Sequence, residues 1–329
     1  MKAVLVETPG GIDKLVIKEY PMPTPREDEL LVKIKATALN RADILQRQGK
    51  YPPPPGASEV LGLEMAGIVE WVGSQCSGWK IGDRVCGLLP GGGYAEYCTI
   101  PAKMAIPIPS NLSFEEAAAI PEVFLTAFQT MHLLGDVKKG DFVLIHAGAS
   151  GVGTAAIQLA RFYDAIPIVT AGSARKLDFC LQLGAKVAIN YKDGEFASHV
   201  LEATDRKGVQ FILDCVGASF WEQNIACLAM DGKMVMIANM GGSVVENFSL
   251  RKILLKRLQI MGSTLRSRNL EYKIQLTQSF VKNILPAFED GKLKPVIDEV
   301  FDWRDVGKAH QRMEENLNMG KIILTITEF

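Results

Sequence analysis

The hydrophobic pattern of the chain changes near residue 120. Before that point, short runs of alternating apolar and polar residues are separated by glycine and proline. Such runs are typical of half-buried strands, and the turn residues between them interrupt helices. The pattern therefore predicts a small, mostly β domain over residues 1–120. Its strand-like runs are KAVLVE, LVIKEY, ELLVKIKATALN, MAGIVEWVG and AEYCTIPA.

From residue 121, continuous apolar runs alternate with segments of helical spacing. The apolar runs are DFVLIHAG, AIPIVTAG, KVAINY, FILDCVG, GKMVMIANM and LQIMGSTL. The helical segments are EVFLTAFQTMHLL, GTAAIQLARFY, ARKLDFCLQLG and FWEQNIACLAM. Strands that are apolar on both faces and alternate with helices predict a parallel sheet covered by crossover helices. The fold class is therefore α/β, with a doubly wound sheet over residues 121–266.

The tail, residues 267–329, contains a predicted amphipathic helix, YKIQLTQSFVKNILPAFEDG, and ends in the strand-like run GKIILTITEF. This last strand has no evident partner in the parallel sheet. We therefore expect the tail to return and complete the first domain.

Composition and charge change this picture little. Hydrophobic residues make up 48% and charged residues 22% of the chain, as in ordinary globular proteins. A formal net charge of -1 gives no reason to expect a nucleic-acid or anionic-membrane partner. We interpret the basic clusters at 251–257 and 266–268 as solvated helix faces. No run of residues is typical of a signal peptide or a membrane span, so we expect a cytoplasmic protein.

The residues that bind metals in other proteins are scattered. The six cysteines form no C-x-x-C pair, and no two of the four histidines stand four residues apart. We expect free, largely buried thiols and no metal site.

A glycine-rich turn joins the first strand of the parallel sheet to its helix. Gly148 is predicted to make the tight turn and Gly153 to allow close helix–strand packing. Ser150 stands where the dinucleotide fingerprint has its middle glycine. Backbone N–H groups at Gly151 and Val152 would still attract phosphate at the helix N-terminus. The alternative is an ordinary turn between a strand and a helix.

The next strand indicates which dinucleotide binds. An NAD site places an acidic residue near the end of this strand, where it accepts a hydrogen bond from the ribose 2′-OH. Here the strand runs into Gly172 and Ser173, and Arg175 and Lys176 follow. Small donors and cations favour a 2′-phosphate, so the sequence predicts NADPH. The alternative is that the two cations only solvate a helix start.

With these features in place, the chain resembles the zinc-independent quinone oxidoreductases of the medium-chain dehydrogenase/reductase superfamily. Within them it is most similar to the p53-inducible subfamily and its bacterial relatives. The resemblance runs nearly the whole chain. It is carried by the motifs ALNRADILQRQGKYPPPPGAS, LGLEMAGIVEWVG, IGDRVCGLLPGGGYAEY, AAAIPEVFLTAFQ, HAGASGVGTAAIQLA and ILDCVG.

The resemblance implies a GroES-like catalytic domain, a Rossmann domain and an active site in the cleft between them. It also implies a homodimer formed through the edge strand LQIMGSTL, with tetramers in some relatives. Where zinc-dependent relatives carry Gly-His-Glu, this chain has Gly62, Leu63 and Glu64. Leucine does not ligate metal, Asn40 stands near the place of the catalytic cysteine, and the four-cysteine lobe is missing. No zinc is expected.

The resemblance also implies roles for individual residues. Tyr51 and Asn40 would face the substrate or nicotinamide, and Ser150 would contact the cofactor or the acceptor. The alternatives are a Tyr51 ring packed on its proline run and a turn-capping Asn40. Glu64 is expected to accept hydrogen bonds from buried loop donors, and Asn316 stands where some relatives have a cofactor-binding arginine. The cofactor-binding set is Thr126, Gly148, Ser150, Gly151, Val152, Gly153, Gly172, Ser173, Lys176, Tyr191, Cys215, Ala238, Asn239, Met240, Ser263, Thr264 and Leu265.

Without a metal, the acceptor must take up hydride readily, as quinones and α,β-unsaturated carbonyls do. The first hypothesis is NADPH-dependent quinone reduction. The second is reduction of 2-alkenals, enones or enoyl thioesters. The third, from another class, is a NADPH-binding structural or RNA-binding protein, since some relatives are lens crystallins that bind RNA.

Overall fold

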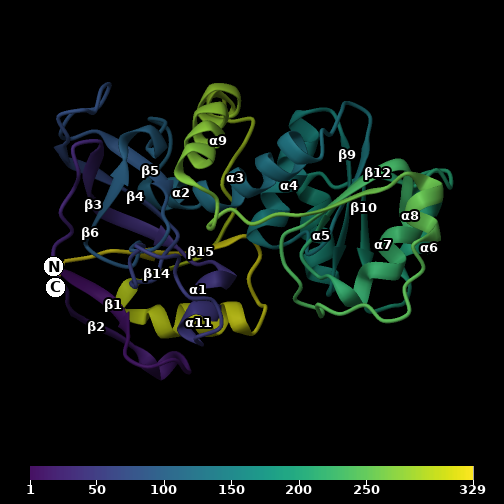
Figure 1. Cartoon of the computed structure of the whole chain (residues 1–329), viewed down its shortest axis with the longest axis horizontal. Helices are drawn as coiled ribbons and strands as arrows, with labels where there is room; N and C mark the ends of the chain where they lie inside the picture. Colours follow the sequence, from purple (N-terminus) through teal and green to yellow (C-terminus); the bar gives the residue numbers. More distant parts are fainter. Residues whose placement is uncertain (329) are drawn as a thin grey trace. The chain divides into compact units, whose positions relative to one another are not determined.

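The computed structural model describes residues 1–328 of the chain, which divides into two compact units (Figure 1). Unit 1 comprises Met1–Leu125 and the tail from Leu265 onward, and unit 2 is Thr126–Thr264. The predicted borders, after residue 120 and after residue 266, stand close to these limits.

Unit 1 is built on a seven-stranded sheet in which β14, β15, β3, β4, β5 and β7 are neighbours in that order and β6 also pairs with β3. A separate antiparallel pair, β1 and β2, lies at the start of the chain. The strands of unit 1 are β1 (Lys2–Val6), β2 (Leu15–Glu19), β3 (Glu29–Ala38), β4 (Glu64–Val72), β5 (Arg84–Leu88), β6 (Tyr97–Pro101), β7 (Ile106–Pro107), β14 (Ile297–Asp302) and β15 (Lys321–Thr325).

The tail of the chain is part of this sheet. Strand β15 pairs antiparallel with β3 and parallel with β14, so the last strand lies against the N-terminal part of the chain (Figure 1). The helices of unit 1 are α1 (Arg41–Arg47), α2 (Phe114–Ala118), α9 (Leu270–Asn283), α10 (Leu285–Glu289) and α11 (Val306–Glu314), with 3-10 turns η1 (Ile12–Lys14), η2 (Ala102–Met104) and η5 (Trp303–Asp305). Helix α3 (Pro121–Phe128) runs from unit 1 into unit 2.

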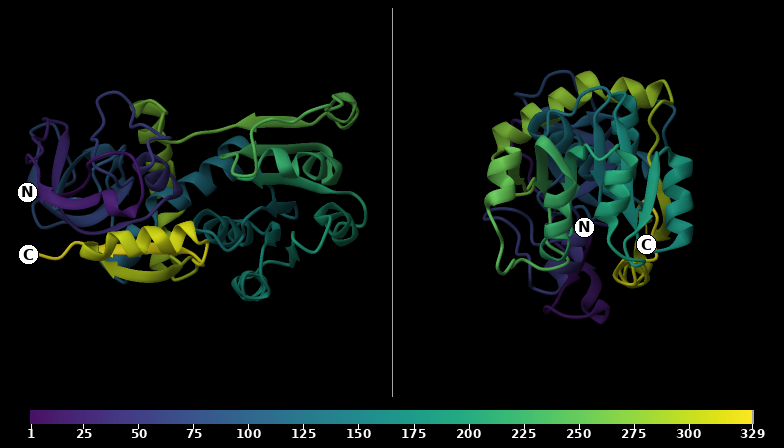
Figure 2. Two further views of the ribbon diagram at one scale, coloured as in Figure 1. Left: turned by 90° about the horizontal axis from the view of Figure 1, so that it is seen from below. Right: turned by 90° about the vertical axis from the view of Figure 1, so that its right-hand side faces the viewer.

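Unit 2 is a six-stranded, fully parallel sheet in the order β10-β9-β8-β11-β12-β13. Figure 2 shows helices on both of its faces. The strands are β8 (Phe142–Ile145), β9 (Ile166–Ala171), β10 (Val187–Asn190), β11 (Val209–Asp214), β12 (Leu228–Met236) and β13 (Gln259–Gly262). The helices are η3 (Gln129–Leu134), α4 (Gly151–Phe162), α5 (Ala174–Leu183), α6 (Phe196–Ala203), η4 (Ala218–Phe220), α7 (Trp221–Cys227) and α8 (Arg251–Lys256).

The central strands of unit 2 carry its hydrophobic core. Leu144, Ile168, Ile212 and Met234, one from each of four neighbouring strands, are fully buried in one cluster. Strands that are apolar on both faces are stable only when helices cover both sides, which is the arrangement predicted from the apolar runs.

Two predicted helices are wrong in part. The helix expected over FWEQNIACLAM ends at Cys227, because Leu228 already pairs with Val209 as the start of β12. The long tail helix breaks after Asn283, and a second helix, α10, starts at Leu285. Pro286, at the start of α10, has no N–H to donate to the preceding turn, which explains the break.

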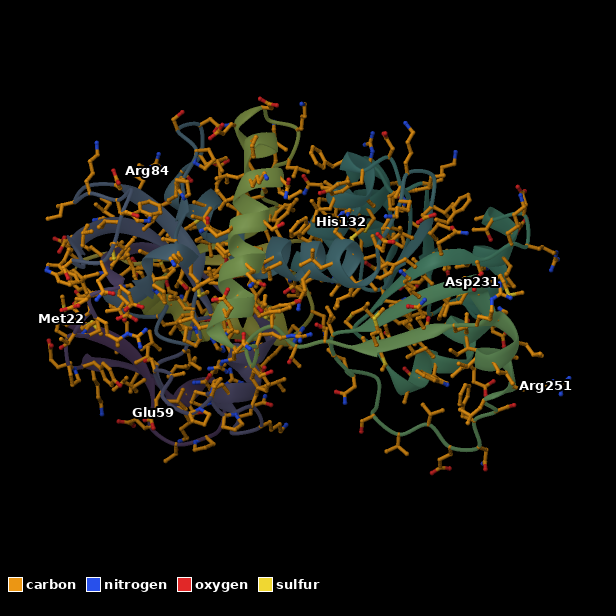
Figure 3. The ribbon with its side chains drawn as sticks, turned by 45° about the horizontal axis from the view of Figure 1, so that its top comes forward. Met22, Glu59, Arg84, His132, Asp231 and Arg251 are labelled. Atoms are coloured by element: carbon orange, nitrogen blue, oxygen red, sulfur yellow. The ribbon has the colours of Figure 1, made fainter. Side chains whose placement is uncertain are left out.

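The basic cluster 251–257 belongs to α8 and its C-terminus. Arg251 extends from the start of α8 (Figure 3) and is exposed. Lys256 Nζ donates to the carbonyls of Ala226 (2.8 Å) and Leu228 (2.7 Å), and Arg257 pairs with Asp231 (2.6 Å). Lys256 and Arg257 thus serve local structure within unit 2, while Arg251 and Lys252 are exposed, as a solvated helix face requires.

Candidate active site

The glycine-rich turn of unit 2 is shaped by close packing. Ala147, not Gly148, is the left-handed residue of the turn, with a φ of 52°. A Cβ on Gly148 would lie 2.7 Å from Val169 Cβ, and a Cβ on Gly153 would overlap the carbonyl oxygen of Ala147. Glycine is therefore needed at 148 and 153 for close approach rather than for a left-handed backbone.

Ser150 is the N-cap of α4. Its Oγ accepts a hydrogen bond from the Gly153 N–H (3.0 Å), which satisfies one of the first amides of the helix. The hydroxyl proton of Ser150 is not used in that bond. Because α4 starts at Gly151, the remaining first-turn amides belong to Gly151 and Val152, the residues predicted to hold the pyrophosphate.

The residues predicted to bind the 2′-phosphate lie at the end of β9 and at the start of α5. Ser173 is the N-cap of α5, and its Oγ accepts from the Lys176 N–H at 3.4 Å. A Cβ on Gly172 would lie 2.8 Å from Tyr191 Oη, so the residue after β10 reaches the residue after β9. The structure thus brings Gly172, Ser173, Lys176 and Tyr191 to one edge of the sheet. Arg175 is exposed there.

The other predicted cofactor residues follow the remaining strands of the same sheet. Cys215 follows β11, Ala238–Met240 follow β12, and Ser263 and Thr264 follow β13. The Met240 N–H donates to the Cys215 carbonyl (3.2 Å), which joins two of these loops. The carboxyl ends of parallel strands are the edge where such sheets bind nucleotides. Both the tight glycine turn and this clustering fit a dinucleotide.

Three predicted residues stand apart from this edge or have unexpected surroundings. Thr126 is buried in α3, where its carbonyl accepts from Thr130 Oγ1 (2.8 Å). Leu265 belongs to unit 1, not to the nucleotide-binding sheet. Ser263 Oγ is buried and, among the described residues, has no hydrogen-bond partner, so it keeps a free polar group at the end of β13.

In unit 1, a buried ion pair lies beside Asn40. Lys321 Nζ lies 2.8 Å from Glu64 Oε1 and donates to Asn40 Oδ1 (2.7 Å) and the Leu39 carbonyl (2.6 Å). Asn40 Nδ2 donates to the same Glu64 oxygen at 2.8 Å, and the Glu122 N–H donates to its other oxygen at 2.8 Å. Glu64 thus accepts from buried donors, as predicted, and both ends of the Asn40 amide have protein partners.

These residues do not fit zinc. Leu63 offers no ligand atom, and both oxygens of Glu64 already accept from protein donors. The cation held by Glu64 is the Lys321 ammonium group, which lies against Oε1. Three protein ligands and an open position are what catalytic zinc requires. Among residues 1–328, no group of three or more His, Cys, Asp and Glu side chains is placed to hold a metal ion.

A second buried polar chain links α1 to α11, and nothing in the sequence pattern predicted it. Tyr94 Oη donates to Asp43 (3.2 Å) and lies 3.4 Å from His310 Nε2. His310 Nδ1 lies 3.2 Å from Arg47, which pairs with Glu314 at 2.6 Å. Burial raises the pKa of Asp43 to about 6, and burial together with Arg47 lowers the pKa of His310 to about 3.

Tyr51 lies next to an arginine that the sequence interpretation misplaced. The guanidinium carbon of Arg266 lies 5.2 Å from the centre of the Tyr51 ring. Arg266 is only 6% exposed, so the interpretation of cluster 266–268 as a solvated helix face is wrong for this residue. Its neighbour Arg268 lies over Tyr272 instead, at 4.5 Å. The local pattern contained no signal for this burial, because the partners of Arg266 lie far away in the sequence.

Two carboxyl groups act electrostatically on this arginine, Asp43 first and Glu122 second. Burial, followed by the charge of Glu64, raises the pKa of Glu122 to about 8. Arg266 and Lys321 act in the opposite direction but do not cancel these effects. Glu122 therefore carries its proton at neutral pH.

Replacing Glu122 with Gln is expected to remove part of the pH dependence of stability. With a pKa raised from 4.5 to about 8, the folded protein binds this proton more tightly than the unfolded chain does. The free energy of unfolding should therefore fall as pH rises through that window, and E122Q should fall less. Chemical denaturation at several pH values from 4.5 to 8 measures this. E289Q, at an exposed acid of α10, serves as control, and an E122Q profile matching that of wild type would contradict the prediction.

Comparison with known proteins identifies the family to which both units belong. A family model described as the alcohol dehydrogenase GroES-like domain matches residues 26–110, and one described as zinc-binding dehydrogenase matches residues 151–280. The human synaptic vesicle membrane protein VAT-1 homolog is 30% identical over 330 residues, which cover 96% of this chain and 84% of that protein. The chain belongs to the medium-chain dehydrogenase/reductase superfamily. Its two parts are therefore a GroES-like domain and a Rossmann domain, as expected.

Solved structures of the superfamily are similar over the whole chain. An Escherichia coli quinone oxidoreductase complexed with NADPH has a TM-score of 0.89 and 30% identity, covering 99% of this chain and 100% of that one. An NAD-dependent alcohol dehydrogenase has a TM-score of 0.87 and 33% identity, covering 99% and 100%. The CurK and JamJ enoyl reductases reach TM-scores of 0.86 and 0.88 at 28% and 26% identity, each covering 99% of this chain and 99% of the other. The chain is an NAD(P)-dependent oxidoreductase of this superfamily.

Within the described part of the chain, every helix is too short or too polar to cross a bilayer.

Proposed function

We propose that this protein is a zinc-independent NADPH:quinone oxidoreductase, related within the superfamily to the p53-inducible subfamily. The observation that carries the proposal is the Lys321 ammonium held between Glu64 and Asn40. Zinc-dependent relatives have a metal-binding motif at this place. In this chain the Glu64 carboxylate and the Asn40 amide oxygen instead bind the ammonium group of Lys321. An acceptor that takes up hydride without a Lewis acid is then required, and quinones have this property.

NADPH is proposed as the cofactor, and it supplies hydride when bound. The amides of Gly151 and Val152 would bind the pyrophosphate, with Ser150 capping their helix. Ser173 and Lys176 would bind the 2′-phosphate, because the residues after β9 include no carboxylate to repel it. The NADPH complex of the E. coli quinone oxidoreductase supports this choice, and the similarity to an NAD-dependent alcohol dehydrogenase makes NADH the necessary comparison.

Tyr51 is proposed as the residue beside the acceptor, while Asn40 is proposed to orient Lys321. Burial raises the pKa of the Tyr51 hydroxyl, so it stays protonated and able to donate to a carbonyl oxygen. The hydroquinone or enolate that forms can take its final proton from water. We further propose a cytoplasmic homodimer formed through β13, which lies at the edge of the six-stranded sheet.

A second candidate is the reduction of 2-alkenals, enones or enoyl thioesters, favoured by the similarity to the CurK and JamJ enoyl reductases. The same protein groups would serve, because hydride uptake again moves charge onto a conjugated carbonyl oxygen.

NADPH consumption with an ortho-quinone, with a 2-alkenal and with no acceptor tests both candidates. We expect the quinone to give the highest kcat/KM. A preference for the alkenal would support the second candidate. NADPH binding without consumption by any acceptor would contradict both and favour a structural or RNA-binding role.

A further inference from the structure

Arg266 is a buried cation whose hydrogen bonds are incomplete. Its Nε donates to the Pro90 carbonyl at 2.9 Å, and its Nη2 donates to Gln46 Oε1 at 2.8 Å. Both acceptors are neutral. Its Nη1 is buried and, within the described residues, has no hydrogen-bond partner. A buried guanidinium that lacks both a carboxylate partner and one of its hydrogen bonds is costly, so a structural role alone does not explain it.

The surroundings of Arg266 increase the excess of positive charge. Lys273 Nζ donates to the Arg266 carbonyl at 2.8 Å, which places a second cation beside it. Of the two acids that act on Arg266, Glu122 has its pKa raised to about 8 and is neutral at pH 7. The other, Asp43, accepts hydrogen bonds from Tyr94 and from the N–H groups of Asn40 and Gly62. Two cations, one neutral carboxyl group and one carboxylate whose oxygens accept from other donors form an environment that favours an added anionic oxygen.

Tyr51 gives this site a flat apolar side. The centre of its ring lies 5.2 Å from the guanidinium carbon of Arg266, and the Tyr51 side chain is partly exposed. Since Nη1 itself is closed to solvent, an incoming oxygen must displace a covering group, and the Tyr51 ring over the guanidinium is the side chain placed to give way. A planar molecule could then lie against the ring with its oxygen on Nη1.

We propose that Arg266 Nη1 binds the carbonyl oxygen of the acceptor, and that Arg266 selects planar conjugated acceptors whose oxygen becomes anionic. This inference rests on the proposed function. When the conjugated acceptor takes up hydride from the reduced nicotinamide, its π electrons move onto that oxygen. The charge-assisted hydrogen bond to Arg266 strengthens as the charge develops, and a proton from water then completes the hydroquinone or enol.

The binding test needs neither cofactor nor turnover. The probes are 2-naphthoate and 2-naphthamide, which share shape but differ in the charge on oxygen. Calorimetry on the wild-type protein should show the naphthoate bound about tenfold or more tightly than the amide, the size expected of one charge-assisted hydrogen bond. R266M should lose this preference, with amide binding unchanged. R268M, which removes the neighbouring arginine over Tyr272, should keep it.

R266K keeps the positive charge and most of the aliphatic chain of Arg266. It therefore provides a second test if R266M does not fold. We expect R266K to keep a reduced preference, because a lysine ammonium cannot also span Pro90 and Gln46. Equal binding of the two probes by wild-type protein would overturn the proposal. So would a folded R266M or R266K with an undiminished preference, which is the result expected if Arg266 only braces these two loops.

Kinetics separate this inference from the proposed function. With an ortho-quinone, R266M should lower kcat/KM about tenfold or more, while the Kd for NADPH stays that of wild type. If the wild-type protein prefers naphthoate but reduces no acceptor, the anion site at Arg266 is supported and the oxidoreductase proposal is rejected. Quinone reduction that is unaffected in R266M would reject the role of Arg266 and leave the proposed function intact.

Discussion

Lys321→Met is expected to destabilise the protein by about 3–5 kcal/mol, the usual result of removing one partner of a buried ion pair. Lys321 is 3% exposed and Glu64 is fully buried. Methionine keeps the length of the stem but leaves the Glu64 carboxylate without its cation and the Leu39 carbonyl without its donor. Denaturant unfolding at neutral pH measures the loss. It should appear as a lower midpoint with an unchanged slope.

Two matched variants make this result specific. K33M removes a lysine that pairs with Glu328 at the same distance, 2.8 Å, but at the exposed surface, so water screens the pair and the loss should be much smaller. The double variant E64Q/K321M removes both charges and should be more stable than K321M alone, because no unpaired charge remains. A K321M protein as stable as K33M would show that the ion pair does not hold this region together.

Unit 2 was largely predictable because its determinants are local. Most of its β-strands are continuous apolar runs, and four of its helices were visible as segments with helical periodicity, although α6 was missed and α8 was inferred only from its basic cluster. The phosphate turn also lies within a few residues of Gly148. The errors were also local: Leu228 begins a strand although periodicity alone does not distinguish a short apolar run in a strand from one in a helix. Pro286 was a visible helix-breaking signal within the tail.

The polar chemistry of unit 1 was not predictable in this way, since it depends on pairs far apart in the sequence. Lys321 reaches Asn40 across 281 positions, and Arg266 reaches Gln46 across 220. A single sequence contains no pattern that joins such residues, and a cation seen alone is most simply placed in solvent. Arg266 illustrates the consequence: its surface placement was the reasonable interpretation, and tertiary packing overrode it.

Ser173→Asp is expected to weaken NADPH binding about 30-fold or more and to leave NADH binding equal or stronger. Ser173 caps α5, and aspartate caps helices as well as serine does, so the fold of this turn should be kept. The new carboxylate would repel the 2′-phosphate and could accept a hydrogen bond from the free 2′-OH of NADH. Loss of one charge-assisted bond together with this repulsion sets the size of the effect. Fluorescence titration with both dinucleotides measures it.

Ser173→Asn separates the effect of charge from that of capping. Asparagine has nearly the size of aspartate and caps helices equally well, but it is neutral. S173N should therefore keep the preference for NADPH, and only S173D should lose it. If S173D still bound NADPH as tightly as wild type, the 2′-phosphate would lie elsewhere than at the start of α5. If the wild-type protein itself preferred NADH, the acid-free end of β9 would not determine the choice of cofactor, and the small residues at Gly172 and Ser173 would only reflect the close approach of Tyr191.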